Sequence, residues 1–228
     1  MQLSGLSWPT PDFSTLSRRQ QTLNVQIPYT RSQAGLHLLV DSTGIKFLGE
    51  GEWKCKKHGA EYRRQWRKLH IGIDAKTLQI RAICVTSNNV SDAAVIPDLL
   101  DQLPQDEKLE SLTGDGAYDT KQVYEAVVVH GATPIIPPRK NARIRKGSVF
   151  VQRNAAIAAC KRVGRGIWKA WSGYHRRSLV ETKMNCIKRL GERVMARSFE
   201  SQVNELHIRA AILNRCTELG RPQTAAVA

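Results

Sequence analysis

The order of strand-like and helix-like segments constrains this fold more than any other feature of the sequence. Runs typical of strands cover residues 36–40 (which 45–48 would extend), 68–74, 78–86, 109–113 and 133–136. Helical patterns cover residues 91–103 and 120–130. The second and third strands flank a polar turn that begins at Asp74, so they form a predicted hairpin. This order predicts an α/β domain with a five-stranded sheet.

The chain divides into three predicted parts. Residues 1–35 are loop-like, with room for a short helix, and we interpret them as the remnant of an amino-terminal region or as a linker. Residues 36–219 form the main domain, with a basic insertion at 139–173. A helix is predicted within that insertion at 154–162, and an amphipathic helix at 199–219 ends the domain. Residues 220–228 are expected to be a disordered tail.

Composition excludes several classes of protein. The chain of 228 residues is 41% hydrophobic and 24% charged, which is ordinary for a globular domain. It has no apolar run of membrane-spanning length and no signal peptide, so we predict a cytoplasmic protein without a membrane partner. Its five cysteines are scattered, which favours reduced thiols. Cys55 and His58 have ligand-like spacing, but no second pair follows to complete a zinc site.

Positive charge is concentrated in one part of the chain. The formal net charge is +15, and residues 139–197 hold 17 of the 35 basic residues but only two acids, Glu181 and Glu192. The remainder of the chain is therefore neutral overall. A smaller basic cluster runs from Lys54 to Lys68. Such concentration indicates a polyanion partner, most simply nucleic acid, although a solvated basic face would have the same composition.

Four polar residues of the basic segment share one stripe if residues 174–188 form a single helix. Relative to Glu181, Tyr174 falls at about +20°, Arg177 at about −40° and Lys188 at about −20°. Val180, Met184, Ile187 and Val194 fall on the neighbouring face, which would be buried. Alternatively, the helix begins at Ser178 as N-cap with Glu181 in a capping box, and Tyr174 and Arg177 lie on the entering turn.

Two further acids follow predicted strands. Asp41 comes directly after the run at 36–40, and Asp115 lies between two glycines after the strand at 109–113. The simplest alternative for Asp41 is an acceptor of backbone hydrogen bonds in a turn, and Asp119 would cap the next helix. With Glu181, these acids would converge at the carboxyl edge of the sheet. Three carboxylates beside a basic surface are suited to two-metal phosphodiester chemistry with Mg²⁺.

These motifs together resemble the DDE transposases of bacterial insertion sequences. Tyr174, Arg177, Glu181 and Lys188 match the Tyr-x2-Arg-x3-Glu-x6-Lys signature of one group. Asp-Ser-Thr-Gly at Asp41 and Gly-Asp-Gly-Ala-Tyr-Asp around Asp115 match the two aspartate motifs in order. The resemblance implies an RNase H-like catalytic core, a mixed five-stranded sheet flanked by helices.

The resemblance also implies an activity and its residues. Asp41, Asp115 and Glu181 would be the catalytic, metal-binding triad for two Mg²⁺ ions, with Mn²⁺ as a substitute. The three other signature residues, Tyr174, Arg177 and Lys188, would bind DNA phosphates. The implied reaction is cleavage at the ends of the element followed by strand transfer into target DNA. The implied assembly is a homodimer or larger synaptic complex.

Two departures from the family keep other hypotheses open. Fewer than forty residues precede the first strand, whereas family members carry an amino-terminal helical domain that recognises the element ends. The basic stretch before Glu181 is also short. The chain would then be a truncated fragment that only binds DNA. A third hypothesis is another RNase H-like nuclease, such as a junction resolvase, against which the signature argues.

The tryptophans have two readings. Trp53 and Trp66 lie among cations and would stack on bases or pin a loop. Trp168 and Trp171 would either stack on a flipped base or anchor the basic segment, and anchoring is the simpler reading.

Overall fold

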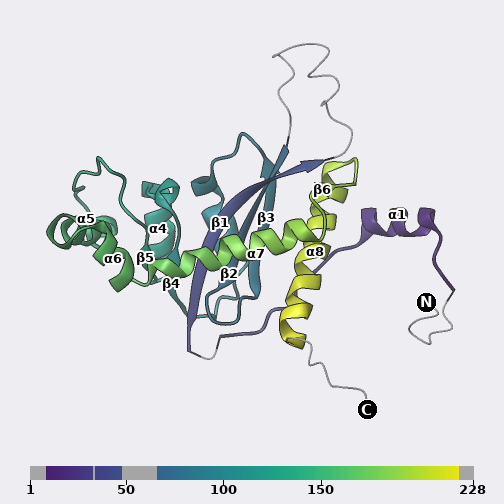
Figure 1. Ribbon diagram of the computed structural model, residues 1–228, viewed down its shortest axis with the longest axis horizontal. Coiled ribbons are helices and arrows are strands. Elements are labelled where there is room, and N and C mark those ends of the chain that lie inside the picture. Colours follow the sequence, from purple (N-terminus) through teal and green to yellow (C-terminus); the bar gives the residue numbers. More distant parts are fainter. Residues whose placement is uncertain (1–8, 33, 48–65, 221–228) are drawn as a thin grey trace, which may run out of the picture.

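The computed structural model describes residues 9–32, 34–47 and 66–220 (Figure 1). The strands are β1 (Leu36–Phe47), β2 (Trp66–Asp74), β3 (Ile80–Ser87), β4 (Leu109–Thr113), β5 (Thr133–Ile135) and β6 (Arg193–Val194). The α-helices are α1 (Phe13–Thr22), α3 (Ile96–Leu100), α4 (Lys121–Val129), α5 (Val151–Val163), α6 (Arg165–Trp171), α7 (Ser178–Arg189) and α8 (Phe199–Leu219). The short 3-10 helices are η2 (Asp92–Val95), η3 (Gly116–Tyr118), η4 (Ser148–Phe150) and η5 (Tyr174–Arg177).

The strands form one mixed sheet with the order β3-β2-β1-β4-β5. β1, β2 and β3 pair antiparallel, as the predicted hairpin requires, while β4 and β5 continue the sheet in parallel. The short β6 pairs in parallel with the far end of β1. This arrangement confirms the predicted α/β class and is consistent with an RNase H-like fold.

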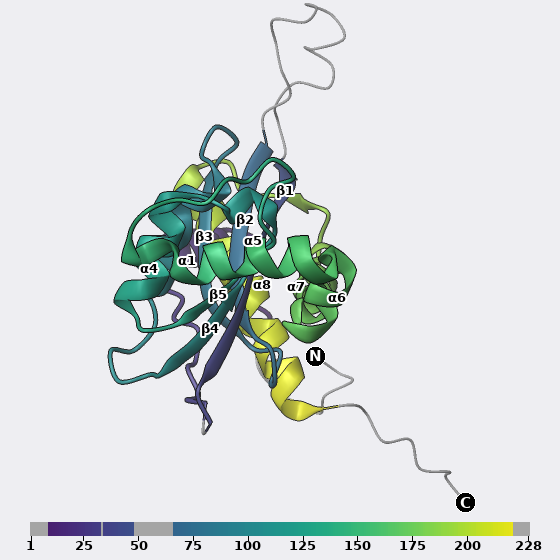
Figure 2. The same ribbon diagram turned by 90° about the vertical axis from the view of Figure 1, so that its left-hand side faces the viewer.

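Helices cover both faces of the sheet (Figure 2). Alternation along β1 divides its side chains between two cores: Leu38 and Val40 pack with α3 and α4, whereas Leu39 and Ile45 pack with α7 and α8. Asp41 follows Leu39 at the next position of the same parity, so it belongs to the face that α7 covers. None of the helices in the described ranges combines the length and apolar composition needed to cross a membrane.

Helix α7 runs along the outer half of β1, the part from Asp41 to Phe47 that lies beyond β4. Arg177, directly before its first residue, lies beside Asp41, and the chain after its last turn forms β6, where Arg193 pairs with Lys46. Figure 1 shows α7 crossing the sheet between α6 and α8. The apolar side of α7 is buried through Val180, Met184 and Ile187, as predicted. Val194, which we had placed on the same helix, lies instead on β6, because α7 ends at Arg189.

Two elements differ most from their predicted bounds. Asp41 does not end its strand, because β2 pairs with β1 from Leu38 to Lys46, well beyond the end of β4. The helix predicted at 91–103 is shorter, consisting of η2 and α3. The strand at 109–113 and the helix at 199–219 have the predicted bounds. Trp53, Cys55, His58 and most of the basic cluster from Lys54 to Lys68 lie outside the described residues.

Candidate active site

The two predicted aspartates lie where β1 and β4 separate. Leu39 pairs with Thr113 at the last position of this parallel ladder. Asp41 and Asp115 each follow two residues later, so both reach the same edge of the sheet. The predicted convergence of these acids therefore follows from the register of two neighbouring parallel strands.

Arg177 is the centre on which all three predicted catalytic acids converge. Its Nη2 lies 2.8 Å from Asp41 Oδ2 and 3.8 Å from Asp115 Oδ2, and its Nη1 lies 2.7 Å from Glu181 Oε1. The last contact joins residues four apart at the start of α7, a spacing that brings side chains together. One guanidinium thus bridges acids from three distant parts of the chain.

Burial in this cluster becomes shallower from Asp41 to Glu181. The exposed side-chain fractions are 14% for Asp41, 38% for Asp115 and 55% for Glu181. Burial raises the pKa of Asp41, and the charges of Asp115 and Glu181 add to this effect, while the Ser42 amide and Arg177 oppose it. Burial disfavours the charged form of Arg177, yet the neighbouring acids raise its pKa. The carboxylates therefore carry more negative charge than one arginine neutralises.

A second layer of polar contacts orients the aspartates. Oδ1 of Asp41 accepts the Ser42 amide at 2.9 Å, and Oδ1 of Asp115 accepts the Ala117 amide at 2.8 Å. The Ser42 hydroxyl donates to Asp92 at 2.7 Å, and Asp92 is itself 2.7 Å from Lys68 Nζ. Each aspartate therefore keeps its second oxygen, Oδ2, directed toward Arg177.

Gly114 is required by packing rather than by room for a ligand. A Cβ atom at this position would lie 2.8 Å from the buried ring of Tyr118 and 3.3 Å from Val40. The glycine lets Tyr118 pack over the end of the sheet beside Asp115. A close contact within the core therefore explains this glycine.

The remaining signature residues separate into two places. Tyr174 lies next to the cluster, with its ring 6.2 Å from that of Trp168 and with Lys169 Nζ 5.1 Å from its centroid. Burial raises the pKa of Tyr174, while the positive charge of Arg177 opposes this shift. Lys188 lies two helical turns beyond Glu181, away from the Arg177 cluster.

Trp168 is 4% exposed and anchors the segment, whereas Trp171 is 80% exposed.

The alternative start of the helix is correct, but its capping box is not. η5 carries Tyr174 and Arg177 on the entering turn, and α7 begins at Ser178. Ser178 makes no capping bond, because its hydroxyl donates to the His175 carbonyl oxygen. Glu181 is engaged by Arg177 rather than by a backbone amide.

Two other aspartates have roles that differ in part from prediction. Asp119 does not cap α4, since the Thr120 hydroxyl accepts the Val123 amide there. Asp74 does accept the Lys76 amide of its turn, and it also binds the buried Arg81 at 3.1 Å.

The donor set of the cluster suits a divalent cation. Its three carboxylates outnumber its single guanidinium, and hard oxygen donors are the ligands that Mg²⁺ prefers. Within the part of the chain that the structure describes, no three acidic, histidine or cysteine side chains are close enough together to hold one ion. Arg177 lies between the carboxylates, so they would have to close around a metal as this arginine withdraws.

Comparison with known families agrees with this geometry. A family model described as a transposase DDE domain matches residues 32–215, and a second model with the same description matches residues 1–50. The chain belongs to the transposase DDE domain family. No solved structure matches the chain. DDE transposases are metal-dependent polynucleotidyl transferases that act on DNA, so an activity related to transposition follows for this chain at the level of the family.

Sequence reasoning missed two features of this DDE domain. The first is the contact of Arg177 with the acids. Its spacing from Glu181, which is the i, i+4 spacing of a helical ion pair, could have indicated it. The ion pair between Lys68 and Asp92, which accepts the Ser42 hydroxyl, had no comparable pattern in the sequence. It joins a strand and a 3-10 helix that meet only through tertiary packing.

Proposed function

We propose that this chain is the catalytic core of a DNA transposase. In this proposal it cleaves DNA at the ends of an insertion element and transfers the freed strand into target DNA. The observation that carries the proposal is the convergence of Asp41, Asp115 and Glu181 on one cation at the carboxyl edge of the sheet. Arg177 and Glu181 belong to the basic segment at 139–197, which suits a polyanionic substrate.

Asp41, Asp115 and Glu181 are proposed to bind Mg²⁺, two ions as the family resemblance implies, with Mn²⁺ as a substitute. When bound, such a cation supplies a Lewis acid that activates an attacking oxygen and stabilises a leaving one. Ser42, Ala117 and the Asp92–Lys68 pair keep the two aspartates fixed. Glu181 is the most exposed of the acids and the one best able to adjust.

Arg177 is proposed to exchange its partners when DNA arrives. A phosphate offers the same paired oxygens to a guanidinium as a carboxylate does. Arg177 can therefore move from the acids to a DNA phosphate while keeping its charge compensated. The exchange returns carboxylate oxygens to the site at the moment substrate binds. Tyr174 and Lys188 are proposed to hold neighbouring phosphates, and two or more copies of the chain to assemble on paired ends.

The test is strand nicking of DNA that carries the native element ends, with and without Mg²⁺. Asp115→Asn and Glu181→Gln should each lower nicking at least about 1000-fold, since several kcal/mol of charge stabilisation is lost. Glu181→Gln should leave non-specific DNA binding near normal. Asp101→Asn, which changes an exposed acid away from the cluster, is the matched control.

Two results would contradict the proposal. A Glu181→Gln protein that still cuts would remove Glu181 from the triad. Wild-type protein that binds these ends and never nicks them would favour a chain that only binds DNA.

A further inference from the structure

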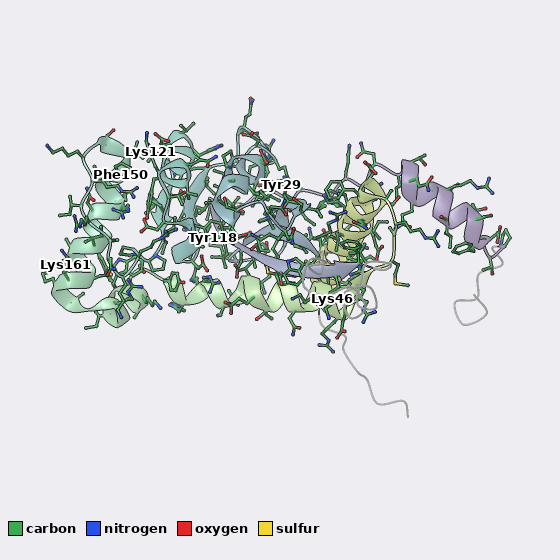
Figure 3. All side chains as sticks on the ribbon, turned by 90° about the horizontal axis from the view of Figure 1, so that it is seen from above. Tyr29, Lys46, Tyr118, Lys121, Phe150 and Lys161 are labelled. Atoms are coloured by element: carbon green, nitrogen blue, oxygen red, sulfur yellow. The ribbon has the colours of Figure 1, made fainter. Side chains whose placement is uncertain are left out.

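A groove of about 470 Å³ lies along α7, on the side of Lys188 that faces away from the Arg177 cluster. We call it the basic groove. Its lining residues are Gly44, Lys46, Asn185, Lys188, Arg189, Gly191, Glu192 and Arg193. They come from the outer half of β1, the last turns of α7 and the turn into β6. Figure 3 labels Lys46 at the end of α7 near α8.

The groove opens at a gap in the pairing of β1. β4 pairs with β1 only as far as Leu39, and β6 begins to pair with it only at Lys46. Among the described strands, none pairs with this edge of β1 in between. Asp41 lies at the start of this gap, and Gly44, one of the lining residues of the groove, lies within it. The groove and Asp41 therefore lie along the same edge of β1.

The charge of the groove is strongly positive and largely uncompensated. Four cationic side chains line it, against the single acid Glu192. Lys188, Arg189 and Arg193 have no ion-pair partner among the residues that the structure describes. Arg189 and Arg193 are exposed, and Lys188 is half-buried. Cations that lack internal partners are available to an anion from outside.

One wall of the groove is rigid. Buried Arg209 donates to the carbonyl oxygens of Gly191 at 2.5 Å and of Arg193 at 2.7 Å, and Glu205 holds the same guanidinium at 2.5 Å. A Cβ atom at Gly191 would lie 2.6 Å from Arg209 Nη2, so a larger residue there would displace this guanidinium. The turn that presents Arg193 is therefore fixed before any ligand binds.

The distance from the acids sets the position of the ligand. Glu181 and Lys188 are seven residues apart on a helix, which is about 10 Å along its axis. Asp41 and Gly44 are three residues apart on a strand, which is also about 10 Å. A DNA strand advances about 3.4 Å along the duplex axis per nucleotide. For a duplex whose axis runs along α7, both paths place the groove about three nucleotides from a phosphate held at the acids.

We propose that the basic groove is a second binding site for the sugar-phosphate backbone of duplex DNA. Its position relative to the cleaved bond rests on the proposed function, whereas its binding of DNA does not. No aromatic side chain appears among its described lining residues, so it offers no platform for stacked bases. Arg189 and Arg193 contact phosphates without reading sequence and hold the duplex in register at the acids.

The first test measures affinity for a 30-base-pair duplex of arbitrary sequence, in EDTA, over a series of salt concentrations. Replacing Arg189 and Arg193 together by Gln should reduce the slope of log K against log salt by about 1.8, because two phosphates are no longer neutralised. The control replaces Lys108 and Arg215, which are exposed and lie outside the groove, by Gln. Equal slopes for the two double variants would overturn the proposal.

Glu192→Gln tests the same site, and its expected effect on DNA affinity is opposite to that of the arginine replacements. Removing the single acid of the groove should tighten DNA binding several-fold, an outcome that misfolding does not produce. Affinity that stays unchanged or falls would contradict the proposed charge pattern.

A third measurement places the groove on the substrate. On a duplex that wild-type protein nicks, single neutral methylphosphonate linkages are introduced near the cut. A linkage about three nucleotides away should weaken wild-type binding but not binding by the variant with Arg189 and Arg193 replaced. If no linkage position has this effect, the assigned register is wrong. If wild type fails to nick at all, the proposed function fails, while the salt series still decides whether the groove binds DNA.

Discussion

Two arginines form ion pairs with aspartates from the segment that follows β4, and they differ in how fully they neutralise their acidic partners. Arg153 binds Asp119 through Nε at 2.6 Å and Nη2 at 3.3 Å, with both side chains almost fully buried. Asp119 also accepts the Tyr124 hydroxyl and the Arg139 amide. Burial alone would raise the pKa of Asp119, but the bonds from Arg153 and Arg139 more than offset it and lower that pKa.

The Arg177 cluster, four residues earlier at Asp115, lacks this balance. Arg177 serves three carboxylates instead of one, and its Nε is buried without a hydrogen-bond partner among the described residues. The pKa of Asp41 is raised by burial and by its acidic neighbours. The cluster therefore retains negative charge that a further cation can neutralise.

The difference separates an ion pair that stabilises the fold from one that suits chemistry. A buried carboxylate whose oxygens are all bonded gains nothing from a new ligand. Carboxylates that share one cation keep unmet demand for positive charge, which a metal ion can supply. Functional candidates in this segment are thus recognised by incomplete compensation rather than by the presence of an aspartate.

Breaking the balanced pair should have the largest effect on stability. Arg153→Ala leaves Asp119 buried without its main partner, so we expect a loss of about 3–5 kcal/mol in the free energy of unfolding. Urea denaturation measures this loss. Arg162→Ala on the same helix, at an exposed position, should change stability by no more than about 0.5 kcal/mol. Similar midpoints for the two variants would show that the Arg153 pair does not brace the fold.

Removing the arginine of the unbalanced cluster should shift metal affinity more than stability. Arg177→Gln withdraws the cation that competes for the carboxylates, so affinity for Mn²⁺ without DNA should rise about tenfold, or about 1.4 kcal/mol. Isothermal titration calorimetry measures it. The melting temperature should fall less than in Arg153→Ala, because Asp115 and Glu181 remain partly hydrated, and Mn²⁺ should restore it.

Arg177→Lys is the matched variant, since it keeps the positive charge and loses the paired N–H donors of the guanidinium. It should bind Mn²⁺ more like wild type than like Arg177→Gln. Weaker Mn²⁺ binding by Arg177→Gln than by wild type would mean that Arg177 assembles the carboxylates instead of competing for them.

The sequence alone predicted most of the sheet because apolar runs and turn residues carry that information locally. The strand at 109–113 and the aspartates beside it followed from such patterns. The continuation of β1 through Asp41 could not be predicted, because it depends on a partner, β2, that pairs beyond β4. The role of Asp119 was missed for the same reason, since Arg153 is distant in sequence.

For the site, the sequence predicted which acids lie together better than how they interact. Asp41, Asp115 and Glu181 lie together as expected, because strand register and one helical turn determine their positions. The contact of Arg177 with the acids was not predicted, and its assignment to DNA phosphates stays a prediction. The groove around Lys188 arises from the gap between β4 and β6, which no local pattern reveals.

Acid titration should distinguish the balanced pair through a smaller effect. The folded-state pKa of Asp119 lies below its unfolded value of about 3.9, so its ionised form stabilises the fold above that pH. This contribution is lost as pH falls through the folded pKa. Asp119→Asn lacks it at every pH, so the stability difference from wild type should be constant above about pH 5 and narrow below about pH 4. Urea midpoints from pH 7 to pH 3 measure the difference, with exposed Asp101→Asn as control. A difference that persists undiminished at pH 3 would mean that Asp119 acts through hydrogen-bond geometry rather than through its charge.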